Sequence, residues 1–225
     1  MQSADLLFSR HQETLAQNSF ASDILKLNHL QESGILKWLF YPGMLFDSEH
    51  KWWGDWKYRS SKHEGLDLAF YLDLNLSLRK IWPGFMVPAL YPGQVKLIIK
   101  DFLGQSVFLE HDPFSSKDYS FCSLYAHLKP DQGLEPGLHI KSGQCLGEVL
   151  NTGARINLAP HIHLSLGWFK GDILPGISWP VINSRKDMLF IDPLKALNME
   201  YALLNENTNM AEQTNYSSGG RDGSH

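Results

Sequence analysis

Two short stretches of the sequence contain side chains that could bind a divalent metal ion. KHEGLD at 62–67 contains His63 and Asp67, and APHIHL at 159–164 contains His161 and His163. Side chains two positions apart point to the same face of a strand, so we expect the two histidines of the second stretch on one face. Imidazoles are costly to bury without a partner. Nitrogen and carboxylate ligands that leave one position open for water are typical of a catalytic zinc site.

The first stretch does not fit the helical zinc-protease motif. That motif, H-E-x-x-H, needs a second histidine where this chain has Asp67. Gly65 and the preceding Ser-Ser-Lys also disfavour a helix. We therefore predict a turn that leads into one strand, GLDLAFYLDL at 65–74, with Asp67 on the face opposite its alternating apolar side chains.

Composition excludes several other classes of protein. The 225 residues carry a net charge of −4 with scattered basic residues, so the chain has no electrostatic footprint for nucleic acid. It has no apolar run of the ~18–20 residues that a membrane span needs. Two cysteines, Cys122 and Cys145, are too few for a disulfide scaffold. Whether the two cysteines form a disulfide stays open. The simpler interpretation is that each is a small buried apolar residue.

The chain divides into three parts by its pattern. Residues 1–58 form an extension with helical spacing up to about residue 40, followed by a tryptophan-rich approach segment. Within 59–200, short apolar runs alternate with Gly, Pro and Asp, which predicts strands and turns. Residues 201–225 have little to bury, and we expect them to be disordered. Trp52, Trp53 and Trp56 could stack on sugars or peptides, although packing on the core is the simpler interpretation.

A third histidine lies between the two metal-binding stretches. In LYAHL at 124–128, strand alternation would place Tyr125 and His127 on one face. A metal-dependent hydrolase needs an acid or a base beside its ligands, and a histidine suits that role near neutral pH. By itself, His127 is more often an exposed or hydrogen-bonded histidine than a catalytic one.

The order of these motifs resembles the lysostaphin/LytM-type zinc metallopeptidases. H-x-G-x-D, then Y-x-H-L, then H-x-H after a proline follow in the family's order over roughly residues 60–170. VPALYPGQV at 87–95 and IKSGQCLGEVLNTG at 140–153 also resemble that family. The resemblance implies a mainly β fold: an antiparallel lysostaphin-type core (duplicated hybrid motif-like) with N-terminal and C-terminal helical extensions. Residues 59–200 would then be a zinc metallopeptidase domain.

The resemblance also implies a role for each residue. His63, Asp67 and His163 would bind one Zn²⁺ per chain, and His127 and His161 would be the catalytic pair. Tyr125 and His111 are weaker candidates for substrate binding. Ser165 stands where the family usually has Glu, so we expect different support of the zinc ligands.

The implied function is a zinc-dependent endopeptidase that hydrolyses peptide bonds of bacterial cell-wall peptidoglycan. One alternative is a non-catalytic LytM-like domain that binds cell-wall peptide or regulates a partner hydrolase. Another is a structural-metal or carrier domain, although a closed structural site would need four protein ligands. The resemblance implies a cell-envelope or secreted protein, whereas residues 1–17 do not resemble a signal peptide. The compartment, the oligomeric state and any blocking of the cleft by the N-terminal segment or by 170–187 stay open.

Overall fold

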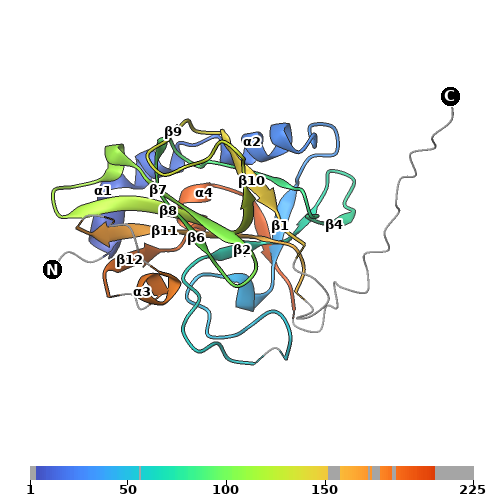
Figure 1. Ribbon diagram of the computed structural model, residues 1–225. Helices are drawn as coiled ribbons and strands as arrows, with labels where there is room; N and C mark the ends of the chain where they lie inside the picture. The colour runs from blue at the N-terminus through green and yellow to red at the C-terminus, as the bar shows by residue number, and fades with distance from the viewer. Residues whose placement is uncertain are drawn as a thin grey trace.

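Two β-sheets and a few short helices make up the fold (Figure 1). The computed structural model describes residues 4–55, 57–151, 158–171, 173, 178–183 and 186–205. All but one of the strand pairings are antiparallel, and helices occur near both ends of the chain. The predicted fold class, mainly β with antiparallel sheets and terminal helices, is confirmed.

The larger sheet has nine strands and contains most of the predicted strand region. Its main path runs β12-β11-β8-β7-β6-β9, with β10 also paired to β8, β5 to β10 and β2 to β11. The strands are β2 (Leu66–Leu68), β5 (Met86–Pro88), β6 (Gly93–Lys100), β7 (Gln105–Glu110), β8 (Tyr119–Pro130), β9 (His139–Ile140), β10 (Cys145–Val149), β11 (Ile162–Lys170) and β12 (Met188–Ile191). The long strands β8 and β11 lie side by side in its middle, so both faces of their side chains are buried.

The smaller sheet joins residues from both ends of the chain. Its order is β13-β1-β3-β4, with bounds β13 (Tyr201–Leu203), β1 (Lys37–Phe40), β3 (Phe70–Leu72) and β4 (Leu78–Lys80). Strand β1 pairs in parallel with β13 and antiparallel with β3. Two expectations therefore differ from the structure: the helical pattern does not extend to 40, and residues 201–203 are a strand. Within the predicted tail, residues 206–225 lie outside the described residues.

The predicted strand at 65–74 is two strands in different sheets. Strand β2 pairs with β11, and β3 pairs with β1 and β4, with a break at Ala69 between them. The Ala69 carbonyl accepts a hydrogen bond from the Ile81 backbone N–H at 2.9 Å and is not part of either ladder. The chain thus crosses from the larger to the smaller sheet after Leu68, the residue that follows Asp67.

Helices cover both faces of the larger sheet. Helices α1 (Ala4–Ala16) and α2 (Phe20–Leu27) contribute Leu15, Phe20 and Ile24 to the main core, together with the C-terminal α4 (Leu194–Leu197). On the opposite face, α3 (Trp179–Asn183) adds Ile182 to a second apolar cluster with Phe108 and Leu124. Two short 3₁₀ helices, η1 (Pro42–Met44) and η2 (Asp112–Phe114), complete the elements. Figure 1 shows α2 and α3 on opposite sides of the sheet.

None of the helices that the structure describes is long and apolar enough to cross a membrane. The two cysteines are both free: Cys122 is buried in strand β8, and Cys145 is partly exposed in strand β10. The question of pairing that the sequence left open is thus answered in favour of two separate thiols.

Candidate metal centre

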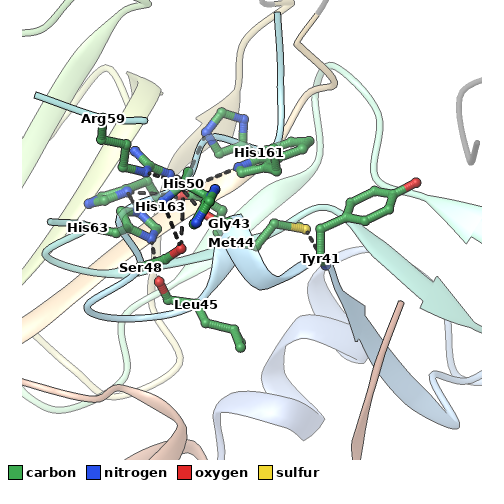
Figure 2. A network of polar contacts seen from close by, with 12 residues as sticks. Tyr41, Gly43, Met44, Leu45, Ser48, His50, Arg59, His63, His161 and His163 are labelled. Atoms are coloured by element: carbon green, nitrogen blue, oxygen red, sulfur yellow. Dashed lines mark hydrogen bonds and ion pairs between the residues drawn. The ribbon is translucent and has the colours of Figure 1, made fainter. Parts of the chain in front are cut away.

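Strand pairing brings three predicted ligands together. In the β2–β11 ladder, Asp67 lies directly opposite His163, and His63 precedes β2 by a short turn. His163 Nδ1 lies 2.9 Å from Asp67 Oδ1, and His63 Nε2 lies 3.2 Å from both of those atoms. All three side chains are buried. Figure 2 shows the rings of His63, His161 and His163 close together.

The outer nitrogens of the two rings fix which atoms face the centre. His63 Nδ1 lies 3.0 Å from the Leu45 carbonyl oxygen, which can only accept, so the proton of the neutral ring is on Nδ1. His163 Nε2 lies 2.9 Å from Ser165 Oγ and 3.7 Å from a Glu64 carboxylate oxygen, which favours the proton on Nε2. The lone pairs of His63 Nε2 and His163 Nδ1 therefore point toward Asp67 Oδ1.

Three electron-pair donors that meet without a proton between them favour a cation. Zinc is bound at about 2.0–2.1 Å by histidine nitrogen, so two ligand atoms of a tetrahedral site are roughly 3.3 Å apart. The separations of 2.9–3.2 Å here are close to that value. His63, Asp67 and His163 therefore fit a zinc ion, and each histidine also has the outer hydrogen bond that metal-binding histidines need.

The carboxylate of Asp67 is ionised in this setting. Burial alone would raise its pKa, but the neighbouring imidazoles of His63, His161 and His163 hold the pKa well below its usual range. Its second oxygen, Oδ2, accepts a hydrogen bond from Trp52 Nε1 at 2.7 Å and lies 3.6 Å from Arg59 Nη2. No local pattern in the sequence predicts either contact.

Gly65 is required by the close approach of β2 to β11. A Cβ atom at this position would lie 2.5 Å from the Leu164 carbonyl oxygen, 2.7 Å from Ser165 Oγ and 2.8 Å from His163 Nε2. These atoms belong to the centre of a paired strand and to a proposed ligand. They have little room to move away from an added methyl group.

We expect Gly65→Ala to destabilise the protein by about 1–3 kcal/mol, the usual cost of overpacking a core. It should also weaken zinc binding, since the methyl group displaces the His163 ring. Chemical denaturation and a zinc titration would measure the two effects. Gly133→Ala is the matched control, because its added Cβ meets nothing closer than an Asp131 oxygen at 3.8 Å. Equal stability of the two variants would contradict the expectation.

His161 is positioned beside the three ligand atoms. Its Nδ1 donates to the Ala159 carbonyl oxygen at 2.9 Å, so its Nε2 carries the lone pair, 3.9 Å from Asp67 Oδ1. Burial lowers the pKa of His161 to about 3, although Asp67 opposes that shift. The indole of Trp52 meets this ring edge-on at 5.3 Å between centroids.

A β-bulge aims His127 at the same place. Strand β8 has one residue more than β7 between the pairs Val107–Tyr125 and Gln105–Leu128, and His127 has a φ of 66°. Its ring centroid lies 5.0 Å from that of His161 and 5.8 Å from that of His163. The side chains of His127, His161 and the three proposed ligands thus come from β2, β8, β11 and the turns beside them.

Asp101 holds His127 in this position. This carboxylate, in the turn between β6 and β7, accepts from the His127 backbone N–H at 2.9 Å and lies 3.2 Å from His127 Nδ1. Burial would raise its pKa, but His127 and Ser106 keep it below the usual range. The sequence signals a turn here through Asp101 and Gly104. Nothing local in the sequence places that turn beside His127.

A comparison with known protein families matches one region of the chain. Residues 77–174 match the model of "Peptidase family M23". The chain carries a region that matches peptidase family M23. The predicted lysostaphin-type resemblance is confirmed at this level. The M23 region includes His127, His161 and His163, whereas His63 and Asp67 lie before its first matched residue and join the site through the geometry above.

Three solved structures give weaker likenesses to the M23 region and its flanks. The prophage-encoded M23 protein EnpA from Enterococcus faecalis is 22% identical, over 61% of this chain and 88% of that one, with a TM-score of 0.36. LytU is 22% identical, over 68% of this chain and 83% of that one, with a TM-score of 0.41. Lysostaphin from Staphylococcus simulans is 20% identical, over 59% of this chain and 42% of that one, with a TM-score of 0.39. At these values no activity follows from them. A comparison with curated proteins found no significant match.

Two predicted substrate-binding residues do not reach the cleft of the M23 region. Tyr125 is fully buried, and its hydroxyl oxygen accepts from the Leu90 backbone N–H at 2.7 Å. The bulge explains the error, because the extra residue in β8 turns His127 away from the face of Tyr125. His111 is also fully buried, between the Pro92 carbonyl oxygen and Ser123 Oγ, each at 2.8 Å. Both are residues of the core.

His111 makes the stability of the protein depend on pH. Burial lowers its pKa to about 4, against the opposing effects of the Pro92 carbonyl and Glu110. Between the ordinary value of about 6.5 and 4, the unfolded chain binds a proton that the folded protein does not. The stabilisation is therefore complete above pH ~6.5 and is lost as the pH falls toward 4.

Between pH 7 and pH 4, we expect the free energy of unfolding of the parent to fall by on the order of 3 kcal/mol more than that of the variant His111→Gln. The variant lacks the titrating imidazole. Urea unfolding at several pH values would measure it, and parallel curves for the two proteins would contradict it.

A cleft of about 510 Å³ is lined by four of the five proposed site residues, Asp67, His127, His161 and His163. Trp53, Phe102 and Trp179 supply aromatic walls, and Lys100 and Arg59 supply positive charge. The approach segment and Trp179 of the 170–187 excursion therefore line the cleft. Residues 172, 174–177, 184–185 and Trp56 are outside the part that the structure describes.

Proposed function

We propose that the protein is a zinc-dependent endopeptidase that hydrolyses peptide bonds of bacterial cell-wall peptidoglycan, with one Zn²⁺ per chain. The observation that carries the proposal is the meeting of His63 Nε2, Asp67 Oδ1 and His163 Nδ1 within 3.2 Å of one another, beside His127 and His161. Three protein ligands leave a position free, which is typical of catalytic zinc and not of structural zinc.

Zinc bound there would supply a Lewis acid and would lower the pKa of a coordinated water toward about 7. His161 is the proposed base, because its Nε2 lone pair faces the centre while Nδ1–H is held by the Ala159 carbonyl. His127 is the proposed second catalytic residue. Its Nδ1–H is directed at Asp101, so in the imidazolium form its Nε2–H would stabilise charge on the substrate carbonyl oxygen or protonate the leaving amine.

The walls of the cleft support a peptide substrate. Trp53, Phe102 and Trp179 offer aromatic surface for an extended chain, and Lys100 offers a charge for the carboxylates that peptidoglycan stems carry. Peptidoglycan as the substrate rests on membership of the M23 region in its family. A peptidoglycan substrate also implies that the protein acts at the cell envelope.

A non-catalytic domain that binds cell-wall peptide or regulates a partner hydrolase is the alternative. It predicts that the ligand set need not take up metal. The experiment is to purify the protein with zinc supplied, measure the zinc content, and follow the release of new amino groups from bacterial peptidoglycan before and after chelation. One zinc per chain and hydrolysis that is lost on chelation would support the peptidase. Full hydrolysis without metal would overturn it, and a protein without bound zinc would favour the alternative.

A further inference from the structure

The two oxygens of the Asp67 carboxylate have different neighbours. Oδ1 faces His63 Nε2 at 3.2 Å and His163 Nδ1 at 2.9 Å, where the zinc would bind. Oδ2 points the other way and accepts the indole N–H of Trp52 at 2.7 Å. A carboxylate can bind a metal through one oxygen or through both. The indole N–H therefore competes with the metal for Oδ2.

Trp52 also contacts a proposed catalytic histidine. Its ring is only 4% exposed and meets His161 at 5.3 Å with the planes at 86°, and it packs edge-on against Phe70 at 6.0 Å. One rigid side chain thus contacts the outer oxygen of a proposed ligand and the ring of the proposed base. Trp52 comes from the approach segment, which precedes the match to the family at residue 77.

Arg59 is a more distant partner of Asp67 Oδ2 than Trp52 is. Its Nη2 lies 3.6 Å from Asp67 Oδ2, beyond hydrogen-bond length, and donates instead to the Gly43 carbonyl oxygen at 2.9 Å. The guanidinium is also stacked on the Trp53 ring at 4.5 Å. Arg59 therefore adds charge near Oδ2, and Trp52 is the group that directs the oxygen.

We propose that Trp52 is a positioning residue of the metal centre, which keeps Asp67 a one-oxygen ligand and thereby keeps the fourth coordination position open for water. This rests on the proposed function in that the site takes up zinc. Without the indole N–H, Oδ2 is a buried carboxylate oxygen that keeps only the longer ion pair with Arg59, so the carboxylate gains by turning both oxygens to the metal. The approach segment is then a working part of the active site.

The test compares Trp52→Phe with Trp168→Phe, both in the full chain. Trp168 is a matched control, because it is fully buried and its indole N–H also makes one hydrogen bond, to the Phe114 carbonyl oxygen at 3.1 Å. Zinc affinity is measured by competition with a chelator. Removing the hydrogen-bond partner of a metal ligand lowers metal affinity by about 10- to 100-fold. We expect a loss of zinc affinity in that range for Trp52→Phe and no loss for Trp168→Phe.

Cobalt provides a readout that a purely structural role would not change. In the Co²⁺-loaded parent, we expect the intense visible absorption of four-coordinate cobalt. In Trp52→Phe the absorption should fall, because the second carboxylate oxygen raises the coordination number. An unchanged spectrum together with unchanged zinc affinity would overturn the inference. If the parent binds zinc but does not cleave peptidoglycan, the proposed function fails and the inference on Trp52 still stands or falls by these spectra.

A measurement on the parent keeps the inference testable if Trp52→Phe does not fold. With the indole nitrogens labelled with ¹⁵N, addition of zinc should shift the N–H signal of Trp52, identified by its contact with His161, and leave the signal of Trp168 in place. A Trp52 signal that does not respond to zinc would contradict the role assigned to it.

Discussion

His163→Ala is expected to abolish both zinc binding and peptide hydrolysis. His163 is the central member of the ligand set, with Nδ1 at 2.9 Å from Asp67 Oδ1 and at 3.2 Å from His63 Nε2. Its removal leaves two protein ligands. Removing a residue that only hydrogen-bonds to a ligand lowers metal affinity by about 10- to 100-fold. Removing the ligand His163 should lower the zinc affinity by more than that. Chelator competition measures the affinity, and release of amino groups from peptidoglycan measures the activity.

His139→Ala is the matched control for this experiment. His139 lies in the short strand β9 at the sheet edge and is exposed, so the substitution removes an imidazole without touching the cleft. We expect its zinc affinity and its hydrolysis to equal those of the parent. A His163→Ala protein that still binds one zinc with the affinity of the parent would remove the basis of the proposed function.

His127→Gln should have a different outcome: zinc stays bound, and kcat falls by about 10²–10⁴-fold, the usual contribution of a general acid or base. The reason is geometric, since His127 faces the ligand set but lies outside it, with its ring centroid 5.8 Å from that of His163. Asp101→Asn should lower kcat in the same direction, because the amide no longer accepts from His127 Nδ1 as the carboxylate does. Adding Asp101→Asn to His127→Gln should cause little further loss, since the two residues act as a unit.

Asp73→Asn separates loss of catalysis from loss of folding. Asp73 is buried and fixes a turn much as Asp101 does, accepting from the backbone N–H groups of Asn75 and Ser77 at 2.9 and 2.8 Å. It lies outside the cleft. We expect Asp73→Asn to lose stability and keep kcat. If kcat fell equally in Asp73→Asn and Asp101→Asn, the effect of Asp101 would be structural, and its link to His127 would be wrong.

The sequence determined the residue types of the site and the class of the fold. Short apolar runs with a period of two, separated by Gly, Pro and Asp, indicated strands and turns, and most of those runs are strands of the larger sheet. The two stretches with His63, Asp67, His161 and His163 indicated a metal centre, and the family resemblance implied three of them, His63, Asp67 and His163, as the ligands. The structure brings those three side chains together. Such signals are local, so they can be read without knowing which strands pair.

Only the tertiary structure decided which groups support the site. Trp52 and Asp67 are 15 residues apart, Asp101 and His127 are 26 apart, and Asp67 and His163 are 96 apart. The break at Ala69 and the bulge before Leu128 each change the face or the sheet to which the following residues belong. A regular alternation therefore placed Tyr125 beside His127, whereas one extra residue in β8 put them on different faces. Turns, bulges and strand partners set these contacts through long-range packing, which a periodic pattern in one segment does not contain.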